Sequence, residues 1–290
     1  MSLPKTENRK PKTENPGTKP KALVLYGYGL NCDWETQFAL NQAGAEAVRV
    51  HTSHLLANPA LLWDYHLLAV IGGFSYGDEH GAGVILGLRL KLALGQALQE
   101  FVQAGRLVIG ICNGFQVLVN LGVLPNLSGR EGERLVALIP NDCGNFRDQW
   151  VHLKINPDSP CVFTRGLTSC ELPIRHGEGK FYADPEVLQE LQHQGQVVFR
   201  YALPSGAPAE GRFPENPNGS LLDIAGICDA SGRVFGLMPH PEAGISSFQH
   251  PRWTFDKDCW RRRGELYQEQ AGPGLAIFGR AVEYLQEKVI

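Results

Sequence analysis

Residues 110–114 (GICNG) constrain the fold of this chain more than any other segment. They place Cys112 at the centre of a Gly-x-Cys-x-Gly pattern. The apolar run of residues 107–109 leads into the pattern, and residues 115–119, which look helical, follow it. A buried strand, a tight turn and a helix in this order form a nucleophile elbow, which exposes a reactive side chain on the turn. The segment therefore predicts a strand that feeds directly into a helix.

The position of Cys112 also predicts its chemistry. A thiol at the start of a helix has its thiolate form favoured by the helix dipole and by free backbone N–H groups. We interpret Gly110 and Gly114 as residues that permit a strained turn and leave room for an approaching substrate. The local sequence thus indicates an activated cysteine.

Short apolar runs alternate with helical patterns through the first half of the chain, as in proteins with a buried parallel sheet. We expect strands at residues 22–26, 47–50 and 66–71, and helices at 33–43 and 87–104, the second closed by Gly105. The second half suggests short strands at 150–155, 197–201, 224–228 and 234–238, and a last helix at 273–289. The predicted fold class is α/β, with an open, mostly parallel sheet flanked by helices and added short strands in the second half.

Residues 1–20 differ from the rest of the chain. They hold four prolines and several lysines with almost nothing apolar, and the sequence Pro-Lys-Thr-Glu-Asn occurs in them twice. Such a segment buries too little surface to offset its ordering entropy, so we predict a disordered tail over residues 1–20. No stretch after residue 21 resembles an interdomain linker, which predicts a single domain over residues 21–290.

Composition excludes several classes of protein. A net charge of −3 predicts no strong attraction to nucleic acid or to an anionic membrane. No apolar stretch approaches the roughly 20 residues that span a bilayer, and the N-terminus lacks the apolar region of a secretory signal. Seven cysteines without CxxC spacing argue against a disulfide framework and favour a reducing, cytoplasmic location. The six cysteines other than Cys112 are interpreted as small buried hydrophobic residues.

A thiolate that attacks a carbonyl needs a base, a group that orients the base, and donors for the oxyanion. His240 is the best base among nine histidines, because it follows an apolar strand in residues 236–242 (GLMPHPE). Glu242 points the same way as His240 if the segment is extended, and can hold the imidazole in one tautomer. The alternative is a solvated His-Pro-Glu turn, which becomes the weaker interpretation beside an elbow cysteine.

Oxyanion donors are suggested by Gly72 and Gly73, which directly follow a predicted strand, and by the backbone N–H of Asn113. The alternative is an ordinary strand-to-helix turn. Gln116 lies one helical turn after Cys112 and either binds substrate or is a polar residue of the helix face. The chain has no GxxxxGK[ST] nucleotide loop, no HExxH, and no Pro-Cys-x-x-Cys after its H-x-E sequences, so no metal site is predicted.

These residues resemble the class I glutamine amidotransferases, which use a Cys-His-Glu triad. Further stretches resemble one branch of that family, the PurQ type of glutaminase subunit of phosphoribosylformylglycinamidine synthase. They are residues 29–33 (GLNCD), 72–78 (GGFSYGD), 113–116 (NGFQ), 175–181 (RHGEGKF), 216–220 (NPNGS) and 232–242 (GRVFGLMPHPE). The matches run from about residue 22 to residue 250.

The resemblance implies a glutaminase. Cys112 would form a glutamyl thioester, His240 would protonate the departing ammonia and then activate water, and Glu242 would orient His240. The backbone of Gly73 and Asn113 would form the oxyanion hole, and Gln116 would contact the glutamine. The ammonia would pass to a PurL-type synthetase, often accompanied by a small PurS-type subunit, which converts formylglycinamide ribonucleotide to formylglycinamidine ribonucleotide in purine biosynthesis. No cofactor is expected in this chain; ATP and Mg are expected on the synthetase.

The chain departs from the family pattern where Asn145 precedes Phe146 and Gln149 precedes Trp150, positions that usually carry basic residues in the family. It is also longer than compact family members, through its first 20 residues and through loops such as residues 203–217. Two alternatives stay open at this point. One is a related amidotransferase or thiol hydrolase with another acceptor, and the other is a non-enzymatic protein that retains the fold.

Overall fold

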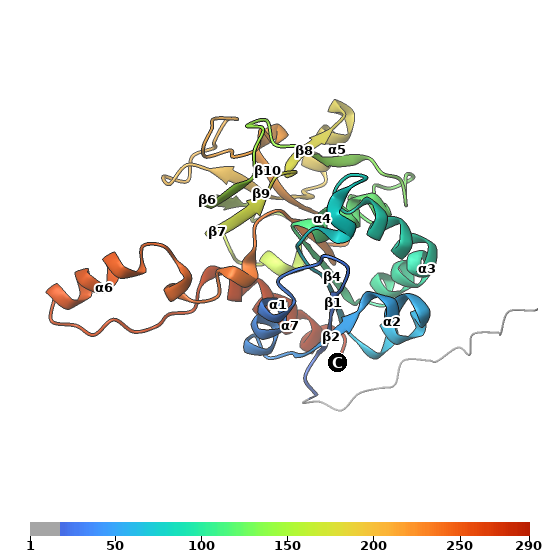
Figure 1. The fold of residues 1–290 in the computed structure, drawn as a ribbon, viewed down its shortest axis with the longest axis horizontal. Coiled ribbons are helices and arrows are strands. Elements are labelled where there is room, and N and C mark those ends of the chain that lie inside the picture. The colour runs from blue at the N-terminus through green and yellow to red at the C-terminus, as the bar shows by residue number, and fades with distance from the viewer. Residues whose placement is uncertain (1–17) are drawn as a thin grey trace, which may run out of the picture.

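The computed structural model describes residues 18–290, so the tail predicted at residues 1–20 lies outside the described residues except for its last three. A nine-stranded sheet in the order β2-β1-β3-β4-β11-β10-β9-β6-β7 runs through the molecule (Figure 1). Its strands are β1 (Lys21–Tyr26), β2 (Glu46–His51), β3 (Leu67–Val70), β4 (Leu107–Ile111), β6 (Arg147–Ile155), β7 (Ser169–His176), β9 (Val197–Ala202), β10 (Ile224–Cys228) and β11 (Val234–Leu237).

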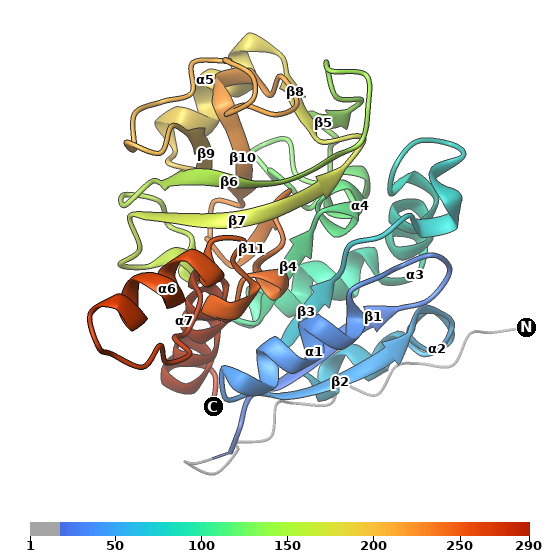
Figure 2. The same cartoon turned by 60° about the vertical axis from the view of Figure 1, so that its left-hand side comes forward.

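The strands β2, β1, β3, β4 and β11 form a parallel half, in which every residue of β3, β4 and β11 is buried. Helices cover both of its faces: α1 and α7 lie on one, and α3 and α4 on the other (Figure 2). The seven α-helices of the described chain are α1 (Asp33–Gln42), α2 (Thr52–Ala57), α3 (Val84–Gln103), α4 (Asn113–Leu121), α5 (Pro185–His193), α6 (Trp253–Arg262) and α7 (Pro273–Lys288). The predicted parallel sheet and its flanking helices are confirmed.

The strands β10, β9, β6 and β7 continue the sheet in antiparallel pairing. Strand β7 was not predicted, because Pro173 interrupts its apolar pattern. Proline is tolerated there since β7 is the last strand of the sheet, and Pro173 lies opposite Trp150 of β6. A separate pair, β5 (Val136–Ile139) with β8 (Lys180–Ala183), was also missed.

Helix α3 begins at Val84, three residues before the predicted start at Gly87. Gly83, in the left-handed conformation at φ 72°, precedes its first residue. Gly87 serves packing instead: a Cβ added there would lie 2.9 Å from Asn120 Cβ of α4. The glycine therefore allows two helices to approach closely and does not mark a boundary.

Residues 246–271, here called the arm, leave the body of the molecule and carry α6 (Figure 1). A backbone bridge between Ser246 and Ala271 closes the base of the arm. No residue of α6 is buried, whereas α7 immediately after the arm buries six of its residues against the core. The arm thus starts within four residues of Glu242.

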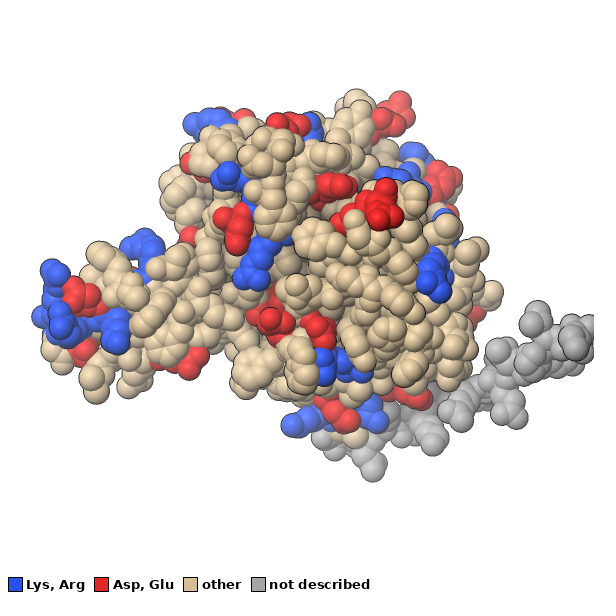
Figure 3. Space-filling view, in the orientation of Figure 1, with Lys and Arg blue, Asp and Glu red and all other residues tan. Residues whose placement is uncertain are grey.

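Charged residues of both signs are interspersed over the face shown in Figure 3. Basic side chains gather at the outer end of the arm, where Arg261 and Arg262 both pair with Asp258. Among residues 18–290, no helix is long and apolar enough to cross a bilayer.

Candidate active site

The elbow predicted around Cys112 is present. Strand β4 ends at Ile111, α4 begins at Asn113, and Cys112 between them has φ 52° and ψ −109°. A positive φ is unusual for a residue with a side chain and marks a strained turn. The Cys112 N–H donates to Leu237 O of β11 (2.8 Å), which ties the elbow to the neighbouring strand. Cys112 is 5% exposed.

The glycines that flank Cys112 serve a different purpose from the one expected. A Cβ added at Gly114 would lie 1.8 Å from Val70 O, and one added at Gly110 would lie 2.7 Å from Gly114 O. Both would strike the protein's own backbone. The interpretation that they leave room for substrate was therefore wrong; Gly114 allows α4 to pass closely over β3, and Gly110 allows it to pass closely over β4.

His240 and Glu242 lie just beyond the carboxyl end of β11, which pairs with β4. His240 Nδ1 and Glu242 Oε1 are 2.6 Å apart, and the two residues are 2% and 1% exposed. A Cβ added at Gly72, beyond the end of β3, would lie 3.0 Å from His240 Cε1 and 3.5 Å from Cys112 Cβ. Thiol, imidazole and carboxylate therefore meet at one edge of the sheet, which excludes the solvated His-Pro-Glu turn.

Burial lowers the pKa of His240, but the neighbouring Glu242 carboxylate and Cys112 outweigh it, so the pKa lies well above its ordinary value. The cationic imidazole is thereby favoured beside the thiol. Since Glu242 occupies Nδ1, the other ring nitrogen, Nε2, is left for Cys112; it has no hydrogen-bond partner among the described residues. Such an arrangement can take up and return a proton at sulfur.

Of the two predicted oxyanion donors, Gly73 lies on the loop after β3 and Asn113 is the first residue of α4, next to Cys112. Within the described chain, neither the Gly73 N–H nor the Asn113 N–H has a hydrogen-bond partner. Gly73 has φ 120°, and a Cβ there would lie 2.6 Å from Asn31 N, so this close turn requires glycine. Two unpaired amides near a thiol suit an oxyanion.

Gln116 is buried, and its side chain is held on both ends. Gln116 Oε1 accepts from Asn113 Nδ2 (3.0 Å), and Gln116 Nε2 donates to Glu178 O. Asn113 Nδ2 also donates to Asp78 Oδ1 at 3.3 Å. The side chain thus connects α4 to the turn between β7 and β8, and a contact between Gln116 and substrate stays a prediction.

A buried polar network holds that turn against the elbow. Asn141 is its centre: Asn141 Nδ2 donates to His176 O (2.9 Å) and Asn145 O (3.0 Å), and Asn141 Oδ1 accepts from Gly179 N (3.0 Å). Asn141 Oδ1 also lies 3.1 Å from His176 Nδ1, so this ring nitrogen carries the proton. Burial, then the charge of His240, lowers the pKa of His176 to about 3, which keeps the ring neutral.

The second part of the network comes from residues 216–220. Asn218 Nδ2 donates to Gly179 O (2.8 Å) and Tyr201 OH (3.2 Å), and Ser220 Oγ accepts from Phe181 N (2.9 Å). Residues 175–181 and 216–220 therefore owe their polar composition to one shared network. The sequence showed both motifs but not that they bind each other, because they are about 40 residues apart.

Replacing Asn141 by alanine should lower the free energy of unfolding by about 3 kcal/mol, since it leaves several buried donors and acceptors unpaired. Chemical denaturation of the variant and the wild type measures the difference. Asn58→Ala is the control, because Asn58 is exposed and caps no helix with its side chain; it should change stability by less than about 0.5 kcal/mol. An equal, small effect of both substitutions would contradict the role given to Asn141.

Cys32 is a site residue that the sequence did not reveal. It is buried at the start of α1, and its sulfur lies within 4.8 Å of donor atoms of His240 and Glu242. All seven cysteines are free. The interpretation as buried residues holds for Cys32, Cys161 and Cys228 and is wrong for Cys143, Cys170 and Cys259, which are partly exposed.

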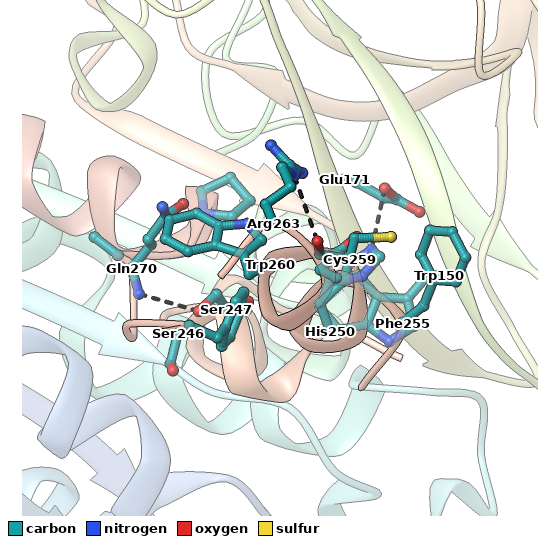
Figure 4. Close-up of a pocket in the computed structure, with 16 residues that line it drawn as sticks. Trp150, Glu171, Ser246, Ser247, His250, Phe255, Cys259, Trp260, Arg263 and Gln270 are labelled. Carbon is teal, nitrogen blue, oxygen red and sulfur yellow. Dashed lines mark hydrogen bonds and ion pairs between the residues drawn. The ribbon is translucent and has the colours of Figure 1, made fainter. Parts of the chain in front are cut away.

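A separate cavity, of about 450 Å³, lies between the arm and the antiparallel half of the sheet (Figure 4). Trp150 and Glu171 line it from the sheet, and Phe255 and Trp260 from the arm. His250 Nε2 is 3.2 Å from Glu171 Oε2 and joins the two sides. None of the predicted catalytic residues lines this cavity.

Comparison with known proteins agrees with this geometry. Residues 19–285 match the family model of the CobB/CobQ-like glutamine amidotransferase domain. The chain is 46% identical over 268 residues to phosphoribosylformylglycinamidine synthase subunit PurQ of Methanococcus maripaludis strain S2, covering 92% of this chain and 98% of the relative. It is 43% identical over 270 residues to the PurQ subunit of Dehalococcoides mccartyi, covering 93% and 99%.

A solved structure, that of PurLQS from Thermotoga maritima, contains a chain with the same fold. The two superpose with a TM-score of 0.65 at 29% sequence identity, covering 92% of this chain and 100% of that chain. The similarity therefore extends over nearly the full length of each of these three relatives and is not confined to the residues around Cys112.

Proposed function

Because this chain belongs to the CobB/CobQ-like glutamine amidotransferases and, among them, to the PurQ subunits of phosphoribosylformylglycinamidine synthase, we propose that it hydrolyses glutamine to glutamate and ammonia. The ammonia serves a synthetase that converts formylglycinamide ribonucleotide to formylglycinamidine ribonucleotide in purine biosynthesis. One observation carries the proposal: a strained, buried thiol shares an edge of the sheet with an imidazole that a carboxylate holds at 2.6 Å.

In the proposed mechanism, the Cys112 proton passes to His240 Nε2, and the thiolate sulfur attacks the side-chain amide carbon of glutamine to give a tetrahedral intermediate. His240 gives its proton to the departing nitrogen, so that ammonia leaves and a glutamyl thioester remains. His240 then removes a proton from water, which attacks the thioester, and the thiol is restored as glutamate leaves. Glu242 keeps Nδ1 engaged throughout and stabilises the charged imidazole.

The oxygen of the amide gains negative charge in both tetrahedral intermediates. The N–H groups of Gly73 and Asn113 are proposed to receive it, since both are unpaired in the described chain. The network around Asn141 acts indirectly, because it fixes the end of β7, which supplies Arg175 O, the acceptor 3.5 Å from Cys112 Sγ.

We propose a PurL-type synthetase and a small PurS-type subunit as partners, as the structure of PurLQS from Thermotoga maritima suggests for its own PurQ chain. ATP and Mg are proposed to bind to the synthetase and not to this chain. The cytoplasmic location stays a prediction.

The test reconstitutes the chain with PurL-type and PurS-type subunits, formylglycinamide ribonucleotide, ATP and Mg. Formylglycinamidine ribonucleotide should form at comparable maximal rates from glutamine and from ammonium salts. If ammonia supports the reaction and glutamine does not, although the chain is folded, the proposal fails. Glutamine-dependent amidation by a different synthetase would instead favour an amidotransferase with another acceptor.

Exchange of Glu242 for glutamine should lower kcat/KM for glutamine at least about 10-fold and change its pH profile. The carboxylate raises the pKa of His240, so a neutral amide lets that pKa fall. The cationic imidazole is then lost at a lower pH, and the alkaline limb of the profile moves to lower pH. Glu287→Gln, on the exposed surface of α7, should leave the profile unchanged. An alkaline limb that stays in place in Glu242→Gln would show that Glu242 does not control His240.

A further inference from the structure

Two carboxylates that have no role in the proposed reaction lie beside the elbow. Asp78 ends the turn that follows β3, and Glu178 lies in the turn between β7 and β8. Asp78 Oδ1 accepts from Asn113 Nδ2 at 3.3 Å. The backbone oxygen of Glu178 accepts from Gln116 Nε2. Both turns therefore contact the first turn of α4, which begins directly after Cys112.

The two carboxylates are held by neighbouring residues just before α3. The Ala82 N–H donates to Glu178 Oε2 at 3.3 Å. The N–H of the next residue, Gly83, donates to Asp78. Burial raises the pKa of Asp78; the Gly83 hydrogen bond opposes this rise, and the charge of Glu178 adds to it. Like charges held in one place repel each other, so a cation that binds between them is favoured.

No basic side chain of the described chain forms an ion pair with either carboxylate. A carboxylate can accept roughly four hydrogen bonds. Within residues 18–290, Asp78 accepts two and Glu178 accepts one through its side chain. Both residues are half-buried, so a ligand can reach them while water screens their charges less than at an open surface. The pair thus suits a positively charged group of a ligand.

Ser75 gives an independent indication of a ligand. It lies in the same turn as Asp78, and its backbone N–H donates to Asn113 Oδ1 at 3.3 Å. Ser75 is 3% exposed, and its hydroxyl is buried without a hydrogen-bond partner in the described chain. Buried polar atoms are normally satisfied, so this hydroxyl indicates a ligand group that completes its hydrogen bonds.

The substrate of the proposed reaction supplies a cation at a suitable distance. Free glutamine carries an ammonium group on its α-carbon, three carbon–carbon bonds away from its side-chain amide carbon. This separation is about 4 Å, and consecutive Cα atoms of a protein are also about 3.8 Å apart. When the amide carbon meets the Cys112 sulfur, the ammonium group can therefore reach the carboxylate that contacts Asn113.

We propose that Asp78 and Glu178 bind the α-ammonium group of glutamine, and that they thereby select an amino-acid amide over simple carboxamides. This inference rests on the proposed function and adds the basis on which the site recognises its substrate. An ammonium group has three N–H donors, so it can bind both carboxylates at once. The two residues hold the substrate in place and take no part in proton transfer.

The test compares two electrophiles that alkylate Cys112 in the reconstituted complex. One is a chloroketone analogue of glutamine, which carries the α-ammonium group, and the other is iodoacetamide, which lacks it. In Asp78→Asn and in Glu178→Gln, the rate constant for the chloroketone should fall at least about tenfold, and that for iodoacetamide should change less than about twofold. Each amide keeps an oxygen that can accept the existing hydrogen bonds, so the substitution removes mainly the charge. Mass spectrometry of the digested chain measures the alkylation of Cys112.

Glu79→Gln is the matched control, because Glu79 is exposed, lies next to Asp78 and loses the same charge. It should leave both rate constants unchanged. The proposal is overturned if the chloroketone rate stays at the wild-type value in Asp78→Asn and Glu178→Gln, or if both reagents slow equally. In either case, wild-type amidation from glutamine would show that the proposed function stands and only the ammonium site is wrong. If neither reagent alkylated wild-type Cys112, the proposed function itself would fail.

Discussion

Cys112→Ala should abolish amidation from glutamine and leave amidation from ammonia intact in the reconstituted complex. The substitution removes only the sulfur that is proposed to carry the acyl group. Loss of a nucleophile that acts together with its base typically costs at least about 1,000-fold in rate. The ammonia-dependent reaction needs only the synthetase, so its rate shows that the synthetase in the assay is active, and co-elution of the chain with the synthetase on size exclusion shows that the complex still assembles. Both rates are obtained from the formation of formylglycinamidine ribonucleotide.

The matched control for this substitution is Cys259→Ala, which removes a thiol from α6 in the arm. It should keep both reactions, apart from small changes. If Cys112→Ala retained glutamine-dependent activity, the thioester mechanism would be wrong. If it lost both reactions, the substitution would act on more than the hydrolysis of glutamine, and the assay would contradict a purely catalytic role.

The sequence predicted the parallel half of the fold well, because its information is local. A buried strand such as β4 consists of consecutive apolar residues, and the elbow after it is recognisable within five residues. Helix α7 was predicted to within one residue from its own pattern and from Pro273 at its start. His240 and Glu242 could be predicted as a pair because only one residue separates them.

The parts of the fold and of the site that the sequence did not predict depend on contacts between distant segments. Strand β7 could not be predicted from the sequence because it contains Pro173. A proline is acceptable in this strand only because the strand lies at the end of the sheet. Cys32 showed no elbow pattern, and its place beside His240 follows from the left-handed turn before α1 and from the pairing of Leu30 with Gly73. The buried network around Asn141 likewise joins three segments that no short pattern relates.

The second large effect concerns folding. Gly114→Ala should prevent stable folding, or lower the free energy of unfolding by several kcal/mol, because the new Cβ would lie 1.8 Å from Val70 O. Backbone of β3 cannot move away without disturbing a strand that pairs on both sides with β1 and β4. Overpacking in a rigid core costs about 1–3 kcal/mol even where side chains can adjust, and here the obstacle is backbone. Thermal unfolding of the purified chain, or its yield in soluble form, measures the effect.

Gly95→Ala is the matched control, since it makes the same chemical change in a helix. A Cβ at Gly95 in α3 meets nothing within 4 Å, and glycine within a helix costs about 0.5–1 kcal/mol relative to alanine. Gly95→Ala should therefore raise the melting temperature, whereas Gly114→Ala lowers it. Opposite signs for one substitution would establish that close approach of backbone requires glycine at the elbow. If Gly114→Ala folded with wild-type stability, the tight passage of α4 over β3, on which the position of Cys112 depends, would be refuted.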